Sequence, residues 1–558
     1  MAQNGLRNFA LHSNDEQDLQ ALETIEDELN AGDAGRSLTF EPDTADPETV
    51  ARRYLNQMIA SPAVPTLGAD DAGGMEFRTL GTETVRLTGA KIVKFAQDYH
   101  RIPVYGSLVT VELDQDNRLL AINSAVGEPS DVDPVATVSP AQALAVIQAD
   151  AGAEVYTAPP RLYFYFDKQV EPNRWRLVHM AKDVPRDDGG EASIPELVDY
   201  VVDAHTAELV ARLPRTQSAS WTPYELALGV HGVQRTMRLE RDEQKNMRMS
   251  DTVRNVRTHD LNFQDAGLRR LLPGDFVANP PDPWLQAAIS AHINAAAVAD
   301  FLVDVLQRNG LDNLGGPFVS SINCTYRNID PNNREWRNAA WIGTQMIYGQ
   351  RMVNGDLRSY AVARDVVAHE IIHGLTDHTA RLEYLQESGA LNESYSDIFG
   401  IIISNWDPDN DGRVDGWDWQ MGEDLDETGV PLRDISDPAR RGQPAHMNDF
   451  KTLRPSEVPN RSNDYGWLHR NSGIHNKAAY NLLTAKDANG EAALSPRDVA
   501  SLFYLALTQY LSRTSGFSDS RTGVRLAAQT YFRAKDPELL ARKLAVIDGA
   551  FDAVGIRA

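Results

Sequence analysis

The pentapeptide HEIIH, from His369 to His373, lies within AVARDVVAHEIIHGLTDHT at residues 361–379. This stretch has no proline and one late glycine, and its apolar residues recur at helical spacing, so it predicts an α-helix. Two histidines four residues apart project from one face of a helix, where both imidazoles can bind one metal ion. Glu370 would lie beside that ion and take a proton from the attacking water. The alternative is a surface helix that happens to carry two histidines and an acid, and a third metal ligand would decide between them.

The segment LEYLQESGALNESYSDIFG, residues 382–400, supplies a candidate third ligand. Its helical part places Glu393 and Asp397 four residues apart on one face. Glu393 would complete a His, His, Glu zinc site with water in the fourth position, the open geometry of a catalytic zinc. Asp397 would accept a hydrogen bond from the outer nitrogen of a liganding histidine, His369, and so fix its tautomer.

Composition limits the classes of protein that this chain can belong to. A chain of 558 residues is too long for one ordinary core, so about two to four domains are expected. The 54 Lys and Arg against 79 Asp and Glu give a net charge of −25, which argues against nucleic acid or an anionic membrane as partner. No apolar run approaches the roughly 20 residues of a membrane span. Cys324 is the only cysteine, so an intramolecular disulfide is excluded and calcium is the usual substitute outside the cell.

The chain divides into regions of different character. An acidic segment contains one predicted helix, ADPETVARRYLNQMIA, and is followed by strand-like alternation in which VTVEL and LLAINS, separated by DQDN, predict a β-hairpin. A Ser-capped helix, SPAQALAVIQADA, and further strands come next, and the polar segment PRTQSASWTP marks a domain boundary. From about residue 361 onward helices dominate. The predicted regions are 1–74 (acidic segment), 75–127, 128–212, 213–224 (linker), 225–376 and 377–558.

HEIIH followed after nineteen residues by Glu393, inside ESGALNESYSDIFG, resembles the thermolysin-like zinc metalloproteases. The metzincin pattern would require glycine and histidine where this chain has Thr376 and Thr379. The resemblance covers about residues 225–558 and implies an α+β multidomain fold. Its catalytic unit has a β-rich N-terminal lobe that includes the zinc helix, a mainly helical C-terminal lobe, and the active site between them. Residues 75–127 resemble the fungalysin/thermolysin propeptide and 128–212 a PepSY-type propeptide, which implies a processing site in the linker.

The segment RNAAWIGTQMIYG, residues 337–349, resembles the edge strand of this family, where an extended substrate pairs by backbone hydrogen bonds. The resemblance implies that the side chain of Asn338 and the carbonyl of Ala339 hold the peptide around the scissile bond. Arg433, in PLRDISDPA, would donate to the substrate carbonyl beyond the cut. The family often has phenylalanine at Ala340, so this strand is expected to grip its substrate less tightly.

DYGWLHRNSGIHNKAAY resembles the family segment that carries the oxyanion stabiliser. The resemblance implies that His469 stabilises the tetrahedral intermediate, that Asp464 orients His469, and that Tyr384 assists it. Glu370 would then be the general base.

Two acidic groups are candidates for calcium. The resemblance implies a site built from Asp365, Asp418 and Glu423, although Ser404 and Gln420 stand where the family usually has acids. The insertion DPDNDGRVDGWD, residues 407–418, has acids at positions one, three, five, nine and twelve and glycine at six, the spacing of an EF-hand loop. The alternative is a plain acidic turn. The acids of this loop are Asp407, Asp409, Asp411, Asp415 and Asp418.

The resemblance implies a zinc endopeptidase made as a zymogen, which cuts proteins and peptides before bulky hydrophobic residues. Its own propeptide would be inhibitor and folding chaperone, and the protein would be an extracellular monomer. The N-terminus, MAQNGLRNFALHS, contains no signal sequence, which leaves a cytoplasmic location or another export route open. The alternatives are an intracellular peptidase of narrow specificity with the same fold, and a catalytically silent relative that binds a partner. The pocket beyond the cut would be lined by Val366, Met421, Leu425 and Leu432.

Overall fold

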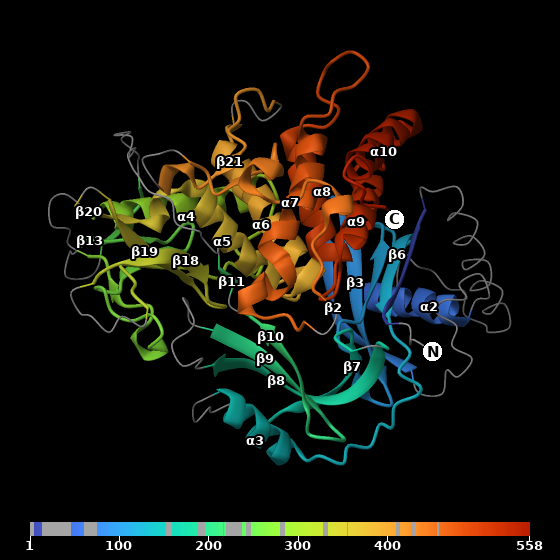
Figure 1. The fold of residues 1–558 in the computed structure, drawn as a ribbon. Coiled ribbons are helices and arrows are strands. Elements are labelled where there is room, and N and C mark those ends of the chain that lie inside the picture. Colours follow the sequence, from blue (N-terminus) through green and yellow to red (C-terminus); the bar gives the residue numbers. More distant parts are fainter. Residues whose placement is uncertain are drawn as a thin grey trace.

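The structure is a computed structural model, drawn as a ribbon in Figure 1. It describes residues 5–13, 46–60, 75–151, 159–170, 172–186, 196–215, 217–218, 237–241, 247–278, 285–326, 333–353, 355–408, 413–425, 430–454 and 457–557.

The first unit is an antiparallel sheet with one helix on it. Its strand order is β1-β6-β5-β3-β2, and the predicted hairpin is present as β5 and β6. Helix α2 buries Leu55 and Met58 against the sheet residues Phe95 and Val111. β1 was not predicted from the sequence and joins this sheet as the neighbour of β6. The elements are β1 (Arg7–His12), α2 (Pro47–Ala60), β2 (Met75–Val85), β3 (Ala90–Tyr99), β4 (Ile102–Pro103), β5 (Leu108–Leu113) and β6 (Leu119–Val126).

The second unit is a four-stranded antiparallel sheet in the order β10-β9-β8-β7. Helix α3 begins after Ser139, whose hydroxyl oxygen accepts a hydrogen bond from Gln142 N at 3.3 Å, so the predicted serine cap is present. Its apolar face, with Ala143 and Ile147, packs against Tyr200 of the sheet. The elements are α3 (Pro140–Ala151), β7 (Arg161–Asp167), β8 (Arg174–Arg186), β9 (Glu196–Asp203) and β10 (Leu209–Pro214).

The third unit is a mixed sheet in the order β11-β18-β19-β17-β15-β14. The expectation that no apolar run approaches the length of a membrane span is wrong for helix α4, which is long and apolar enough by length and composition. Half of this stretch is buried, and the helix packs against α5, β15 and β17. Its apolar character is therefore that of a core helix. The elements are β11 (Gln217–Ser218), β12 (Glu240–Arg241), β13 (Met247–Arg248), β14 (Ser250–Asp251), β15 (Val256–Asp260), η3 (Arg269–Leu271), β16 (Asp275–Phe276), α4 (Gln286–Asp304), β17 (Phe318–Ile322), β18 (Trp336–Trp341), β19 (Met346–Val353), β20 (Asp356–Ser359) and η4 (Tyr360–Val362).

The C-terminal part of the chain is a bundle of helices around α6, which packs against α5 and α7. Helix α8 continues directly into η10, a π-helical turn. The elements are α5 (Arg364–Asp377), α6 (Gln386–Asn405), β21 (Gln420–Met421), η6 (Glu423–Leu425), β22 (Arg433–Asp434), η7 (Pro438–Arg441), η8 (Met447–Asp449), η9 (Arg461–Asn463), α7 (Asp464–Leu483), α8 (Pro496–Leu505), η10 (Ala506–Tyr510), α9 (Phe517–Tyr531) and α10 (Pro537–Asp552).

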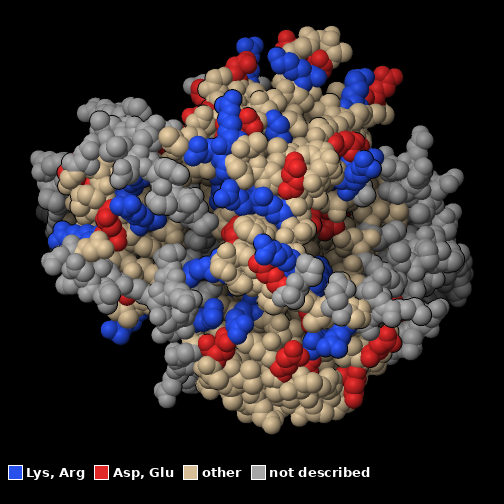
Figure 2. All heavy atoms as spheres, in the orientation of Figure 1, with Lys and Arg blue, Asp and Glu red and all other residues tan. Residues whose placement is uncertain are grey.

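The two N-terminal sheets lie against the rest of the chain rather than apart from it. Figure 1 shows the four-stranded sheet below α7 and β11, and the first sheet beside α9. Figure 2 shows both signs of charge interspersed on this face, with basic side chains across its middle. The net negative charge therefore does not gather into one acidic patch on the face shown.

Candidate active site

Two neighbouring helices carry the three candidate metal ligands. α5 supplies His369 and His373, and α6 supplies Glu393. One ligand atom from each residue lies within 4.8 Å of the other two. The Nε2 atoms of the histidines are 3.1 Å apart, and Glu393 Oε1 is 3.3 Å from His373 Nε2. The donors converge on one point, and two imidazoles with a carboxylate are a set that a catalytic zinc takes.

A carboxylate lies next to the outer nitrogen of the His369 ring. Asp397 Oδ1 lies 2.9 Å from His369 Nδ1, on the side opposite the metal-facing nitrogen. Burial lowers the pKa of His369 to about 4, although the carboxylates of Asp397 and Glu393 act in the opposite direction. The imidazole is therefore neutral near pH 7, the form that binds a metal.

The ring of His373 has two partners that the sequence analysis missed. Its Nδ1 lies 2.9 Å from Asn392 Oδ1 and 3.1 Å from Ser396 Oγ. The amide of Asn392 is oriented in turn, because its Nδ2 donates to Leu382 O at 3.3 Å. Asn392 and Ser396 are four residues apart on α6, so the helical spacing that pointed to Glu393 and Asp397 could also have found this pair.

Glu370 lies between the two histidines on α5 and is fully buried. Its Oε2 accepts a hydrogen bond from the backbone N–H of Trp341 in β18 at 3.1 Å. This contact joins the zinc helix to the strand that carries Asn338 and Ala339. Asn338 is itself buried, and its Oδ1 accepts from Ala339 N at 3.0 Å. The carboxylate of Glu370 is thus held at a defined distance from β18.

His469, Asp464 and Tyr384 also lie together beside the metal ligands. Asp464 Oδ1 is 2.5 Å from His469 Nδ1, and Tyr384 Oη is 3.0 Å from His469 Nε2. Tyr384 also donates to Glu393 Oε1 at 2.5 Å. Burial lowers the pKa of His469, but Glu393 and Asp464 outweigh burial and raise it to about 9. A protonated imidazole is a donor for a developing negative charge.

Arg433 reaches the same point from β22. It is buried, donates to Glu393 Oε2 at 2.8 Å, and also bonds Asp397 Oδ1. Burial raises the pKa of Glu393, but His469 and Arg433 hold it well below its usual range. Glu393 is therefore anionic, as a metal ligand must be. Arg433 therefore lies against the candidate metal ligands.

The outer edge of β18 is occupied by the chain itself. In β11, Gln217 pairs antiparallel with Trp341, and Ser218 pairs with Ala340. Arg215, two residues before β11, lies 3.4 Å from Asp377 Oδ1 at the end of α5, and Asp377 Oδ2 accepts from the indole of Trp341 at 2.9 Å. Gln217 and Ser218, which belong to the expected linker, therefore lie along the strand that carries the expected substrate-binding residues.

The acids expected to bind calcium fall into two groups. Asp365 is buried and accepts from Gly422 N at 2.5 Å. Burial, with the charges of neighbouring acids, raises the pKa of Asp365 to about 7 and that of Glu423 to about 8. Glu423 Oε2 is buried without a hydrogen-bond partner within the described part of the chain. Asp418 is exposed beside this group.

The EF-hand-like loop is only partly described. Asp407 and Asp415 are exposed. Asp409 and Asp411, with the glycine at position six, lie outside the described residues. The backbone of Asp418 is fixed to Asn405, which donates to its carbonyl and accepts from its N–H at 2.8 Å in both cases. The loop therefore ends at a defined point next to α6.

Known protein families match the two lobes and part of the N-terminal region. The thermolysin metallopeptidase catalytic domain matches residues 226–377, and the thermolysin metallopeptidase alpha-helical domain matches residues 380–556. Neutral protease NprE from Bacillus pumilus is 34% identical over 292 residues, which cover 51% of this chain and 83% of that protein. This chain belongs to the thermolysin family of metallopeptidases.

Other relatives extend over more of this metallopeptidase. A bacillolysin from Brevibacillus brevis is 29% identical over 507 residues, 84% of this chain and 83% of that protein. The fungalysin/thermolysin propeptide motif matches residues 76–126. The precursor of protealysin, a metalloproteinase from Serratia proteamaculans, is 28% identical, covers 54% of this chain and 87% of that chain, and has a TM-score of 0.42.

The family models and the Bacillus pumilus relative confirm the expected family, fold class and enzyme type. The metallopeptidase has a β-rich N-terminal lobe, a helical C-terminal lobe and a propeptide, and the three candidate metal ligands come from both lobes. The PepSY-type resemblance of residues 128–212 stays a prediction.

Proposed function

We propose that this metallopeptidase is a zinc endopeptidase in which Glu370 is the general base. The convergence of His369, His373 and Glu393 beside the buried Glu370 carboxylate carries this proposal. Zinc bound there would supply Lewis acidity to the scissile carbonyl and lower the pKa of water. Glu370 takes a proton from the attacking water and delivers it to the leaving amine. His469 and Tyr384 donate hydrogen bonds to the oxyanion, with Asp464 holding the imidazole.

Digestion of a denatured protein tests the activity. The purified protein is incubated with the substrate with and without a zinc chelator, and the fragments are mapped by mass. Internal cuts that disappear with the chelator and return with added zinc are expected. A protein that binds zinc but makes no cuts after maturation would instead be the catalytically silent relative.

The same digest tests the specificity. Cuts are expected before Leu, Ile, Val and Phe. Val366, Met421 and Leu425 are buried and apolar. Met421 contacts Gly400 at a point that is also close to His369, so this pocket lies next to the candidate metal site. Leu432 lies beside Leu425 across Gly422 and carries no charge that would pair with a basic residue. A majority of cuts before Lys, Arg or Asp would contradict this pocket.

The chain is proposed to be a zymogen whose β11 segment blocks substrate pairing. Peptide substrates of this kind add as a strand to an exposed sheet edge, and Gln217 and Ser218 already occupy that edge on β18. Asn338, Ala339 and Arg433 would take up the substrate once the segment leaves. Relatives that include an extracellular elastase from Staphylococcus epidermidis support an extracellular location, and a monomer is proposed as the active form.

A calcium ion is proposed at Asp365, Glu423 and the neighbouring Asp418. Carboxylates gathered in a desolvated place repel one another unless a cation neutralises them, and Glu423 Oε2 is buried without a partner in the described residues. No disulfide is available to stabilise the fold instead.

Millimolar calcium is expected to raise the thermal midpoint by several degrees, because a ligand at 100 times its Kd adds about 2.7 kcal/mol. Glu423→Gln should remove most of that gain. Asp407→Asn is the matched comparison, since it reports on the 407–418 loop. A gain that vanishes in Asp407→Asn and persists in Glu423→Gln would place the ion in the loop. An equal midpoint with calcium and with a calcium chelator would exclude both sites.

A further inference from the structure

The helix formed by α8 and η10 ends against the first N-terminal sheet. The chain leaves the helix at Leu511, which has an extended backbone, so the last carbonyl groups have no following turn to bond. Such carbonyls carry partial negative charge and need donors when they are buried. Thr508, Gln509 and Tyr510, which carry three of them, are all buried.

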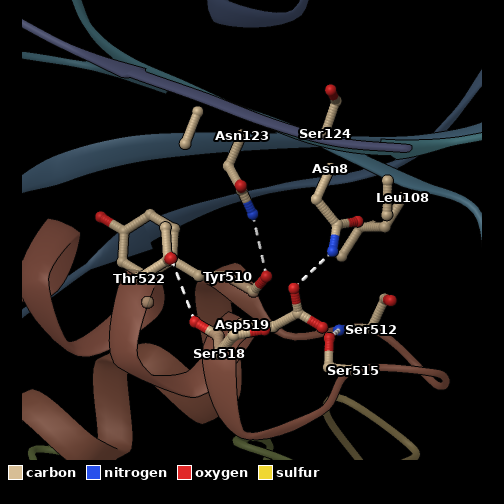
Figure 3. A pocket seen from close by; sticks show the side chains of 13 residues that line it. Asn8, Leu108, Asn123, Ser124, Tyr510, Ser512, Ser515, Ser518, Asp519 and Thr522 are labelled. Atoms are coloured by element: carbon tan, nitrogen blue, oxygen red, sulfur yellow. Dashed lines mark hydrogen bonds between the residues drawn. The ribbon is translucent and has the colours of Figure 1, made fainter. Parts of the chain in front are cut away.

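Three side chains on neighbouring strands supply these donors. Lys94 Nζ of β3 donates to Thr508 O at 2.5 Å, and Thr110 Oγ1 of β5 donates to Gln509 O at 3.0 Å. Asn123 Nδ2 of β6 donates to Tyr510 O at 2.9 Å, as Figure 3 shows. β3, β5 and β6 are adjacent in the sheet, and the three acceptors are consecutive in the helix. One face of the sheet therefore caps one helix end residue by residue.

The contacts around this cap are polar as well. Glu112 Oε2 accepts from Tyr510 Oη at 2.7 Å and from Thr530 Oγ1 at 3.0 Å. His12 Nε2 lies 2.9 Å from the same Thr530 hydroxyl. A cavity of about 300 Å³ separates the sheet from α9 nearby, and hydroxyl, amide and carboxyl groups line much of it (Figure 3).

The sheet also makes apolar contacts, since Val85 and Ile92 belong to the same buried cluster as Leu507 of η10, but the cap itself is polar. Carbonyls and hydroxyls that lose their protein partners on separation are hydrated again, whereas an apolar interface would leave a hydrophobic patch exposed.

We propose that the carbonyl end of η10 is the docking surface by which the first N-terminal sheet holds the C-terminal lobe, through Lys94, Thr110 and Asn123. The occupant is the chain's own segment 75–126, and the contact is separate from the β11 segment in the active site. The docking in the uncut chain is independent of the proposed function. The further claim, that the cut segment stays bound to the catalytic unit after processing, rests on the proposed function.

Hydrogen exchange in the uncut chain tests the docking. In the full-length Glu370→Ala background, Lys94→Met, Thr110→Val and Asn123→Leu each remove one donor. Exchange in segments 90–99 and 108–113 should become about 5-fold faster for each neutral donor and about 10-fold faster for Lys94, from the usual values of such bonds. Lys91→Met is the matched control, because Lys91 Nζ bonds Gln115 O and Asn117 Oδ1 in the turn between β5 and β6 and does not reach η10. Thr84→Val on the exposed part of β2 is the control for Thr110.

Unchanged exchange in all three donor variants would overturn the proposal. If Lys94→Met does not fold while Lys91→Met does, Thr110→Val and Asn123→Leu still give the decisive rates.

The rate at which the cut segment is released tests whether the η10 contact holds it after processing. After maturation of the otherwise wild-type chain, size-exclusion chromatography should show the segment bound to the catalytic unit, and the triple donor variant should lose it at least 10-fold faster. The mature units are then identical in sequence, so their kcat/KM should be equal. If the chain is never cut, the processing proposal fails while the exchange result still stands. If it is cut and the triple variant releases its segment at the wild-type rate, the η10 contact does not hold the segment.

Discussion

The Glu370→Ala protein should bind about one zinc per chain, fold, and remain a full-length chain of 558 residues. The wild type should mature to a fragment of roughly 330 to 345 residues by a cut near β11. The substitution leaves His369, His373 and Glu393 in place. It removes the base, whose contribution in enzymes of this kind is about 10² to 10⁴ in rate, together with the acceptor of the Trp341 N–H. We expect substrate cleavage to fall at least a thousandfold, on the order of the upper part of that range.

An intact-mass time course of both proteins, purified in parallel, checks this result. Glu538→Ala is the matched control, because it makes the same change at a side chain that is 86% exposed on α10. Maturation of Glu370→Ala at the wild-type rate would show that an outside protease does the processing. A wild type that stays full length yet digests substrate would show that the N-terminal region does not inhibit.

His373→Ala should lose nearly all of its zinc and its peptidase activity, and Glu393→Ala should do the same. Each variant leaves two protein ligands where a catalytic zinc needs three. His373→Ala is the easier of the two variants to interpret. Replacing Glu393 would also take away the hydrogen-bond acceptor of Arg433 and of Tyr384. Elemental analysis of the purified proteins measures the metal, and circular dichroism shows whether they are folded.

His378→Ala is the matched control for this loss. His378 follows α5 directly, and its Nδ1 lies 2.8 Å from Gly374 O, so its ring has a backbone partner outside the ligand set. It should keep about one zinc per chain and the wild-type activity. Full zinc in His373→Ala would remove that residue from the ligands.

The metal-binding half of the site follows from local periodicity. His369 and His373 share one helical face, as do Glu393 and Asp397, and a spacing of four residues does not depend on the rest of the fold. The hairpin of β5 and β6 and the capped helix α3 are local in the same sense. The same spacing also predicts Asn392 and Ser396, which are four residues apart on α6, as partners for the second nitrogen of His373.

The rest of the site and of the sheet pairing depends on contacts between distant parts of the chain. Arg433 reaches Glu393 from forty positions away, and β1 pairs with β6 across more than a hundred residues. Hydrophobic alternation predicts a strand and its inner face but does not name the neighbouring strand. For that reason the pairing of β11 with β18, and the capping of η10 by three strands, became visible only in the folded chain.

The short connection between β10 and β11 has a consequence for how strongly the cleft must bind its occupant. β10 ends at Pro214, β11 begins at Gln217, and β10 is anchored in its sheet by β9. A segment tethered so closely is present at an effective concentration on the order of millimolar or above, whatever the protein concentration. A sequence with only millimolar intrinsic affinity would then fill the cleft, and its residues need not resemble a good substrate. Once the tether is cut, the same weak sequence would leave the cleft on dilution.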